Sequence, residues 1–182
     1  DQGFGKLPKT RRNPPKTTGF QGFLTPTMTI RKPADLLDGI SRNGRVLGLD
    51  LGTKTIGLAL SDAGRMIATP YETVKRTKLK ADLARLAEVI AKEGVAALVL
   101  GLPINMDDRE GPRCQATRQF ADDLGKLIDL PLAFWDERLS TYAAEQMLIE
   151  ADLGRKRRRE AIDQVAAAVI LQGCLDAMRR PT

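Results

Sequence analysis

The chain has 182 residues, of which 42% are hydrophobic and 29% charged, a composition typical of one soluble globular domain. It contains no histidine, which excludes catalysis by a histidine base and zinc sites built on histidine. Two cysteines are too few for a four-cysteine zinc site. An aromatic content of 4% argues against a surface that stacks nucleic-acid bases.

The net charge of +6 is concentrated at the N-terminus. Residues 1–34 carry seven basic side chains and one acidic side chain, which accounts for the whole excess. The basic charge is therefore weak evidence for a nucleic-acid partner. We expect residues 1–44 to form a disordered tail. Met28 is the expected natural start, with residues 1–27 as added or upstream sequence, and a native basic arm is the alternative.

No run approaches the roughly 18 apolar residues of a membrane span, and no apolar signal segment opens the chain. We therefore expect a cytoplasmic protein without a membrane partner. Cys114 and Cys174 are expected to be buried as small apolar side chains.

Hydrophobic patterning predicts one α/β domain over residues 45–180. Short apolar runs between turn residues predict five strands, at 46–51, 56–60, 66–74, 96–100 and 132–135. Apolar residues at helical spacing predict four helices, at about 79–93, 113–128, 140–153 and 160–178. Three strands followed by alternating helices and strands predict a mixed five-stranded sheet covered by helices.

Asp50 lies within the first apolar strand, where Gly48 and Gly52 share its face and leave space beside it. Burying an unpaired carboxylate is costly, so a metal ion or a basic side chain is expected next to it. An ion pair with Lys54, or capping of the following turn, are the alternatives.

Two further acidic positions lie near predicted ends of strands and helices. Asp136 and Glu137 directly follow the last strand, and carboxyl ends of parallel strands carry the ligand sites of open α/β sheets. A solvated turn with Arg138 as partner is the alternative. Asp163 is expected in the first turn of the apolar final helix, where the helix dipole alone would favour a carboxylate.

Together, Asp50, the acidic pair Asp136 and Glu137, and Asp163 place carboxylates on two strand ends and one helix in a protein without histidine, which favours Mg²⁺ or Mn²⁺ over zinc. Two such ions about 3.5–4 Å apart serve the attacking and leaving oxygens of a phosphodiester. The residues therefore predict phosphodiester hydrolysis without histidine.

Four sequence blocks, in this order, resemble the YqgF/RuvX family of RNase H-like proteins. Members of this family are described as pre-16S rRNA nucleases and as homologues of Holliday-junction resolvases. The blocks are RVLGLDLGTKTIGLALSD at 45–62, GLPINMD at 101–107, DERLST at 136–141 and IDQVAA at 162–167. The resemblance covers about residues 45–178.

The resemblance implies that Asp50, Glu137 and Asp163 are both catalytic and metal-binding. It also implies a sheet order of 3-2-1-4-5, with the second strand antiparallel, in a bacterial cytosolic nuclease. The implied substrate is structured RNA, such as the 5′ end of pre-16S rRNA, or branched DNA. A ribosomal subunit is a further expected partner, and the protein is expected to be a monomer or a homodimer.

One loop departs from the family pattern, which usually reads Asn-x-Asp-Gly. Asp108 stands where that glycine is usual, and aspartate can adopt a positive φ at some cost. Asn105 and Asp107 are therefore second-rank candidates for contact with the substrate.

A loop before the last helix is predicted to carry five consecutive basic residues, namely Arg155, Lys156, Arg157, Arg158 and Arg159. These residues are candidates for binding the phosphate backbone, and a solvated basic loop is the alternative. Lys54 and Arg138 are candidates for orienting a phosphate nearer to the carboxylates.

Two other functions remain open. The segment from Asp50 to Lys54 is also similar to the phosphate loop of the actin and sugar-kinase superfamily, but those enzymes close two domains on ATP. One domain of this size forms such a cleft only by dimerising. A non-catalytic nucleic-acid-binding module would instead bind through residues 155–159, with the carboxylates as remnants.

Overall fold

The computed structural model describes residues 28–139 and 155–179, with side chains from Ala161 onward in the second range. Its strands form one six-stranded sheet: β1 (Ile30–Arg31), β2 (Arg45–Leu51), β3 (Thr55–Ser61), β4 (Ala68–Lys75), β5 (Val95–Leu102) and β6 (Leu132–Asp136). The described helices are α1 (Leu79–Glu93), α2 (Pro112–Gly125) and α4 (Arg155–Arg179). Two short 3₁₀ helices, η1 (Pro33–Asp35) and η2 (Glu137–Leu139), follow β1 and β6. The helix predicted at 140–153 lies outside the described residues.

The strands lie in the order β1-β6-β5-β2-β3-β4. β2, β5, β6 and β1 pair in parallel, whereas β3 pairs antiparallel with both β2 and β4. The predicted order 3-2-1-4-5, with the second strand antiparallel, is therefore confirmed. One strand, β1, was not predicted. It pairs with β6 at the edge of the sheet, and its two residues are too few to show an alternating hydrophobic pattern.

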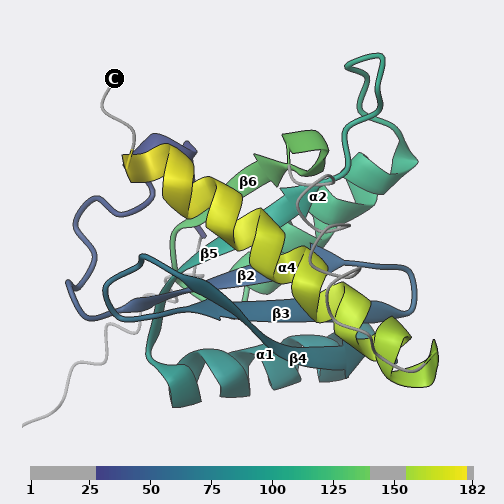
Figure 1. Ribbon diagram of the computed structural model, residues 1–182, viewed down its shortest axis with the longest axis horizontal. Helices are drawn as coiled ribbons and strands as arrows, with labels where there is room; N and C mark the ends of the chain where they lie inside the picture. Colours follow the sequence, from purple (N-terminus) through teal and green to yellow (C-terminus); the bar gives the residue numbers. More distant parts are fainter. Residues whose placement is uncertain (1–27, 140–154, 180–182) are drawn as a thin grey trace, which may run out of the picture.

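Helices cover both faces of the sheet, as Figure 1 shows, with α4 across one face and α1 and α2 on the other. Alternation along β2 divides the core accordingly. Leu47, Leu49 and Leu51 pack with apolar residues of α1 and α2. Val46 packs on the opposite face with α4.

The face of α4 that contacts the sheet combines small residues, including Ala167 and Cys174, with larger aliphatic ones such as Leu171, and it meets alanines of the sheet. Small side chains let the helix axis lie close to the strands. The segment Ala161–Arg179 is long and apolar enough to cross a membrane by length and composition, which the sequence analysis did not anticipate. In this fold it packs against β2, β3, β4 and β5 as the core helix of the domain.

The structure corrects the start of the folded part. Residues 28–44 were expected to belong to a disordered tail, but Met28 is buried and Leu36 is fully inaccessible to solvent. Ile30 and Arg31 pair with β6, and Leu36 joins the apolar cluster beneath α4. The few apolar residues that attach this segment lie among Lys, Pro and Gly, so their spacing predicts neither a helix nor a strand. Their partners are the sheet edge at β6 and the helix α4.

A second correction concerns the start of the final helix. The basic run from Arg155 to Arg159 was expected in a loop, but its backbone is helical and forms the beginning of α4. Arg and Lys have good helix propensity, and no Gly or Pro separates them from Glu160. Asp163 consequently lies in the third turn of α4, so the helix dipole does not explain its position.

Candidate active site

Asp50 lies near the carboxyl end of β2 and faces α4. Its cross-strand partner on β3 is Gly57. On the other side, the register continues from the pair Leu49–Leu100 and places Gly101 of β5 beside Asp50. A carboxylate in the middle of the sheet is thus flanked by a glycine on each neighbouring strand.

Gly57 allows α4 to approach the sheet at Asp163. A Cβ atom at Gly57 would overlap the carbonyl oxygen and carbonyl carbon of Asp163, so only glycine fits this close approach. Because Gly57 pairs with Asp50, the same contact brings Asp163 next to Asp50. The aspartate of a helix more than 100 residues away is thereby fixed beside the aspartate of the first long strand.

Gly101 has the corresponding role for Glu137. A Cβ atom at Gly101 would lie 2.8 Å from Oε1 of Glu137 and 2.6 Å from Cδ1 of Ile170. The carboxylate of Glu137, which opens η2 just after β6, therefore lies over β5 on the face that Asp50 shares. The two glycines bring the three predicted carboxylates together from β2, η2 and α4.

The electrostatics of Asp50 reflect this convergence. Burial, and then the negative charges of Glu137 and Asp163, raise the pKa of Asp50 to about 7, and Arg113 opposes the rise. Among the described residues Asp50 forms no ion pair, so the alternative of a salt bridge with Lys54 has no support. The site therefore favours an added positive charge.

Arg113 is a functional candidate that the sequence analysis missed. It lies in the first turn of α2, is exposed, and lowers the pKa of both Asp50 and Glu137. Burial nevertheless raises the pKa of Glu137 overall. The position of Arg113 could have indicated its role. It is a basic residue directly after Pro112, at the start of a helix that follows the carboxyl end of a buried parallel strand.

The donor chemistry of the site fits a hard divalent cation, because Asp50, Glu137 and Asp163 offer only carboxylate oxygens. The carboxyl groups of Asp50 and Glu137 have raised pKa values, and a bound cation would lower them. Among the described residues, no three acidic or cysteine side chains already stand at metal-ligand spacing. The site is therefore an electronegative cluster rather than a rigid preformed cage.

The guanidinium of Arg138, next to Glu137, is already engaged with acidic side chains. Its Nε donates to both carboxylate oxygens of Asp136 at 3.0 Å, and Nη2 donates to Oδ2 at 2.6 Å. Nη1 donates to Oδ1 of Asp108 at 2.7 Å and to the carbonyl oxygen of Asn105 at 3.2 Å. The guanidinium is thus engaged in tying the loop between β5 and α2 to the end of β6, next to Glu137.

The same loop contains the departure at Asp108. Its φ is +62°, the left-handed conformation that the usual glycine adopts freely. The ion pair with Arg138 offsets part of that conformational cost. Asn105 and Asp107 shape the loop, since the amide of Asp108 donates to the carbonyl of Asn105 and the amide of Arg109 donates to Oδ1 of Asp107.

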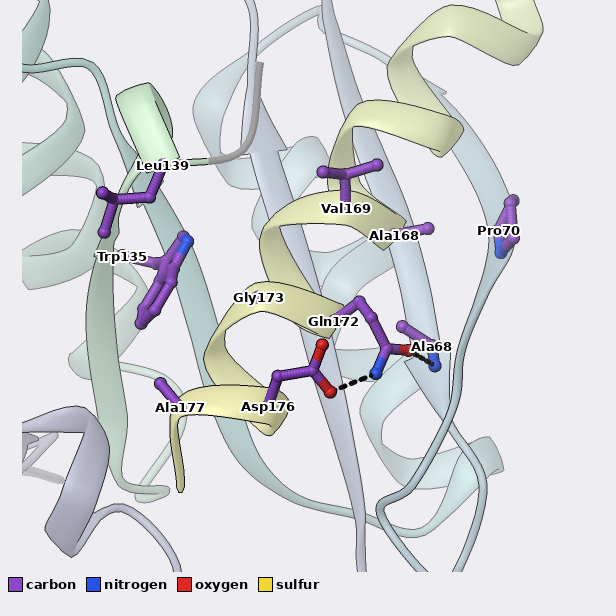
Figure 2. A pocket seen from close by; sticks show the side chains of 10 residues that line it. All are labelled: Ala68, Pro70, Trp135, Leu139, Ala168, Val169, Gln172, Gly173, Asp176 and Ala177. Atoms are coloured by element: carbon purple, nitrogen blue, oxygen red, sulfur yellow. Dashed lines mark hydrogen bonds between the residues drawn. The ribbon is translucent and has the colours of Figure 1, made fainter. Parts of the chain in front are cut away.

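A cavity of about 620 Å³ adjoins Asp163. Its wall includes Lys54 from the turn between β2 and β3, so this predicted residue does lie near the carboxylates. A second hollow, of about 450 Å³, runs alongside the C-terminal half of α4 near Trp135 (Figure 2). None of the three predicted carboxylates lines that second hollow.

In the second hollow, Figure 2 shows Gln172 directed toward the edge of β4. Its Oε1 accepts the amide hydrogen of Ala68 at 2.8 Å, and its Nε2 donates to Oδ1 of Asp176. These bonds satisfy the side-chain amide of Gln172. Cys114 and Cys174 are buried as expected, and burial raises the pKa of both thiols, that of Cys174 to about 12.

Comparisons with known proteins show the family to which the chain belongs. Residues 44–177 match the family model described as RuvX, Holliday junction resolvase. A protein of Paramagnetospirillum magneticum named "Putative pre-16S rRNA nuclease" is 59% identical over 149 residues, covering 82% of this chain and 96% of that protein. A protein of the same name from Roseobacter denitrificans is 57% identical over 154 residues, covering 84% of this chain and 94% of that protein.

Among solved structures, Thermus thermophilus RuvC in complex with a Holliday junction substrate is similar with a TM-score of 0.48 and 17% identity. That similarity covers 75% of this chain and 96% of RuvC. The family model spans nearly all of the described domain, including the segments that carry the three carboxylates. The chain belongs to the RuvX family, a family of enzymes that hydrolyse phosphodiester bonds.

Proposed function

We propose that this protein is a divalent-metal-dependent endonuclease whose substrate is the 5′ end of pre-16S rRNA. The observation that carries the proposal is the convergence of Asp50, Glu137 and Asp163, which the close approaches at Gly57 and Gly101 enforce. A cluster of half-buried acids is costly to a fold unless a cation neutralises it. The names of the relatives from two bacteria support rRNA as the substrate.

In this proposal Asp50, Glu137 and Asp163 hold one or two Mg²⁺ or Mn²⁺ ions. When bound, such ions lower the pKa of a water and neutralise charge on the scissile phosphate. Asp50, whose pKa is about 7, loses its residual proton as a cation binds. Arg113, within electrostatic reach of Asp50 and Glu137, balances the added negative charge of a phosphate.

We also propose which other residues contact the substrate. Lys54 lies in the wall of the cavity beside Asp163 and is suited to bind a phosphate. The basic run Arg155–Arg159, at the start of α4, precedes Asp163 by one to two helical turns and supplies further positive charge. Arg138 orders the loop containing Asn105 and Asp107, which places that loop at the edge of the site. The cytoplasm, where pre-rRNA is processed, is the proposed location.

Cleavage with matched variants tests this proposal. Wild-type protein and Asp50→Asn are incubated with a labelled pre-16S 5′-leader RNA and with a four-way DNA junction, in Mg²⁺, Mn²⁺ or EDTA. We expect metal-dependent cleavage of the RNA by the wild type and a loss of at least 100-fold in Asp50→Asn, since a ligand and charge are removed. Asp122→Asn, an exposed carboxylate on α2, is the control and should retain full activity.

Two results would contradict the proposal. Cleavage of the junction alone would replace rRNA processing with junction resolution, the activity named in the family description. Binding of RNA without any cleavage in either metal would favour the non-catalytic binding module. A second readout avoids dependence on turnover: Mn²⁺ should raise the melting temperature of the wild type and leave that of Asp50→Asn nearly unchanged.

A further inference from the structure

The cavity beside Asp163 has the chemistry of a binding groove for a nucleic-acid backbone. It lies between β3, β4 and the first half of α4 and has a volume of about 620 Å³, within the size range of ligand sites. Asp163 belongs both to its wall and to the carboxylate cluster. A strand lying in the cavity would therefore pass directly along the proposed active site.

The positive charge of the cavity comes from two lysines at one end of the β3–β4 ladder. Lys75 of β4 pairs in register with Thr55 of β3, and Lys54 immediately precedes Thr55 in the turn between β2 and β3, so the two lysines lie at the same end of the ladder. Both side chains are exposed, and neither forms an ion pair with any residue that the structure describes. Lys54 and Lys75 are the two basic residues among those that line the cavity.

Glu72 is the other acidic residue that lines the cavity, and its carboxylate is already paired with a cation of α1. Glu72, also in the wall, accepts from Nε of Arg85 at 3.2 Å and from Nη2 at 2.7 Å, a paired contact to both carboxylate oxygens. Its charge therefore does not compete for Lys54 or Lys75. Away from Asp163, the groove is left with a net positive charge, which suits phosphates.

The turn that carries Lys54 is rigid. The amide of Gly52 donates to the carbonyl of Thr55 at 2.9 Å, and the amide of Arg76 donates to the carbonyl of Lys54 at 2.9 Å. Nη1 of Arg76 also donates to the carbonyl of Gly52 at 2.7 Å. The backbone that presents Lys54 is thus fixed on both sides before any ligand arrives, which lowers the entropy cost of binding.

From these observations we infer that the cavity between β3, β4 and α4 binds one strand of the substrate, with Lys54 and Lys75 contacting phosphates that flank the scissile one. The recognised chemistry is the phosphodiester backbone, independent of base sequence. The inference rests on the proposed nuclease function for the place of the scissile phosphate. The assignment of the groove and of Lys75 depends only on the cavity and its charges.

Salt-dependent binding tests the inference in the 182-residue chain carrying Asp50→Asn, which we expect to bind the substrate without cutting it. Lys54→Ala and Lys75→Ala are each added, and affinity for a labelled single-stranded leader RNA, and for DNA of the same sequence, is measured from 50 to 200 mM KCl. Each variant should lower the slope of log affinity against log salt by about 0.7–0.9, the value for one phosphate contact. At the lowest salt we expect a loss of about two- to fivefold in affinity.

Lys80→Ala is the matched control, because Lys80 is an exposed lysine on α1, across the sheet from the cavity. It should leave the salt slope unchanged, and Lys75→Arg should keep the wild-type slope. An equal effect of Lys80→Ala, or no effect of Lys75→Ala, would overturn the inference. If the lysine effects appear but wild-type protein cleaves neither substrate, the groove stands and the nuclease proposal fails.

Discussion

At the scale of single residues, the ionisation of Asp50 connects the site to the stability of the fold. Its pKa is about 7 in the folded protein and close to 3.8 when the chain is unfolded. Between these values the folded protein holds a proton that the unfolded chain releases, so the free energy of unfolding falls as the pH rises from about 4 to 7. Above pH 7 the repulsion among the carboxylates is fully present.

Asp50→Asn removes this penalty while preserving the shape of the side chain. In metal-free buffer we expect the variant to be more stable than the wild type at pH 8, by on the order of 2–4 kcal/mol, and to approach it near pH 4. Urea unfolding at several pH values measures the difference. Asp122→Asn should follow the wild type throughout, and a pH-independent difference for Asp50→Asn would show that the carboxyl group is not strained.

The carboxylates of the site could be recognised from the sequence more readily than the arginines around them. Asp50 and Glu137 were recognisable because acids stood out against apolar strands and matched family motifs. Arg113 gave no such signal, because an arginine in the first turn of a polar helix is ordinary until the fold places it near two acids. Arg138 was expected to bind the substrate, but its donors meet Asp136 and Asp108.

At the scale of elements, the packing of α4 on β3 decides where Asp163 lies. Gly57→Ala places a methyl group where the backbone of Asp163 now lies, so the helix must move away from the strand. We expect a loss of about 1–3 kcal/mol in the free energy of unfolding, as for other overpacked sites. Displacing Asp163 from Asp50 should also reduce metal-dependent cleavage by about 100-fold, since misplacement by about 1 Å has such effects.

Gly94→Ala is the control that distinguishes the effect of lost stability from the effect of displacing Asp163. Gly94 ends α1 with φ +64°, and nothing lies within 4 Å of the position of its Cβ atom. Alanine there should cost about 1–2 kcal/mol through its left-handed backbone, with cleavage unchanged. Activity of Gly57→Ala equal to that of Gly94→Ala would mean that the close approach of α4 does not position Asp163.

At the scale of the whole molecule, the segment before β2 belongs to the domain. Leu36 is fully buried in the cluster beneath α4, so Leu36→Ala should cost about 2–5 kcal/mol. Chemical unfolding measures this cost, with the half-buried neighbour Leu37→Ala as a milder control. A change of less than 0.5 kcal/mol for Leu36→Ala would show that residues 28–44 are only loosely attached.

Local patterns in the chain predicted the strands from Arg45 onward, and the family resemblance predicted their order and named the three carboxylates that the fold brings together. These features are local or carried by motifs: apolar runs, turn residues, and acids where apolar residues are expected. The tertiary structure alone decided what depends on distant partners. It attached residues 28–44 to β6 and α4, and it extended α4 back through the basic run.

The tertiary structure also decided how the site is assembled. The glycines at 57 and 101 read as ordinary strand residues in the sequence, but their missing side chains admit Asp163 and Glu137 to the space around Asp50. It likewise placed Lys75 beside Lys54 and engaged Arg138 with Asp136 and Asp108. A sequence shows which groups can ionise; their pKa values, partners and distances arise only when strands and helices far apart in the chain pack together.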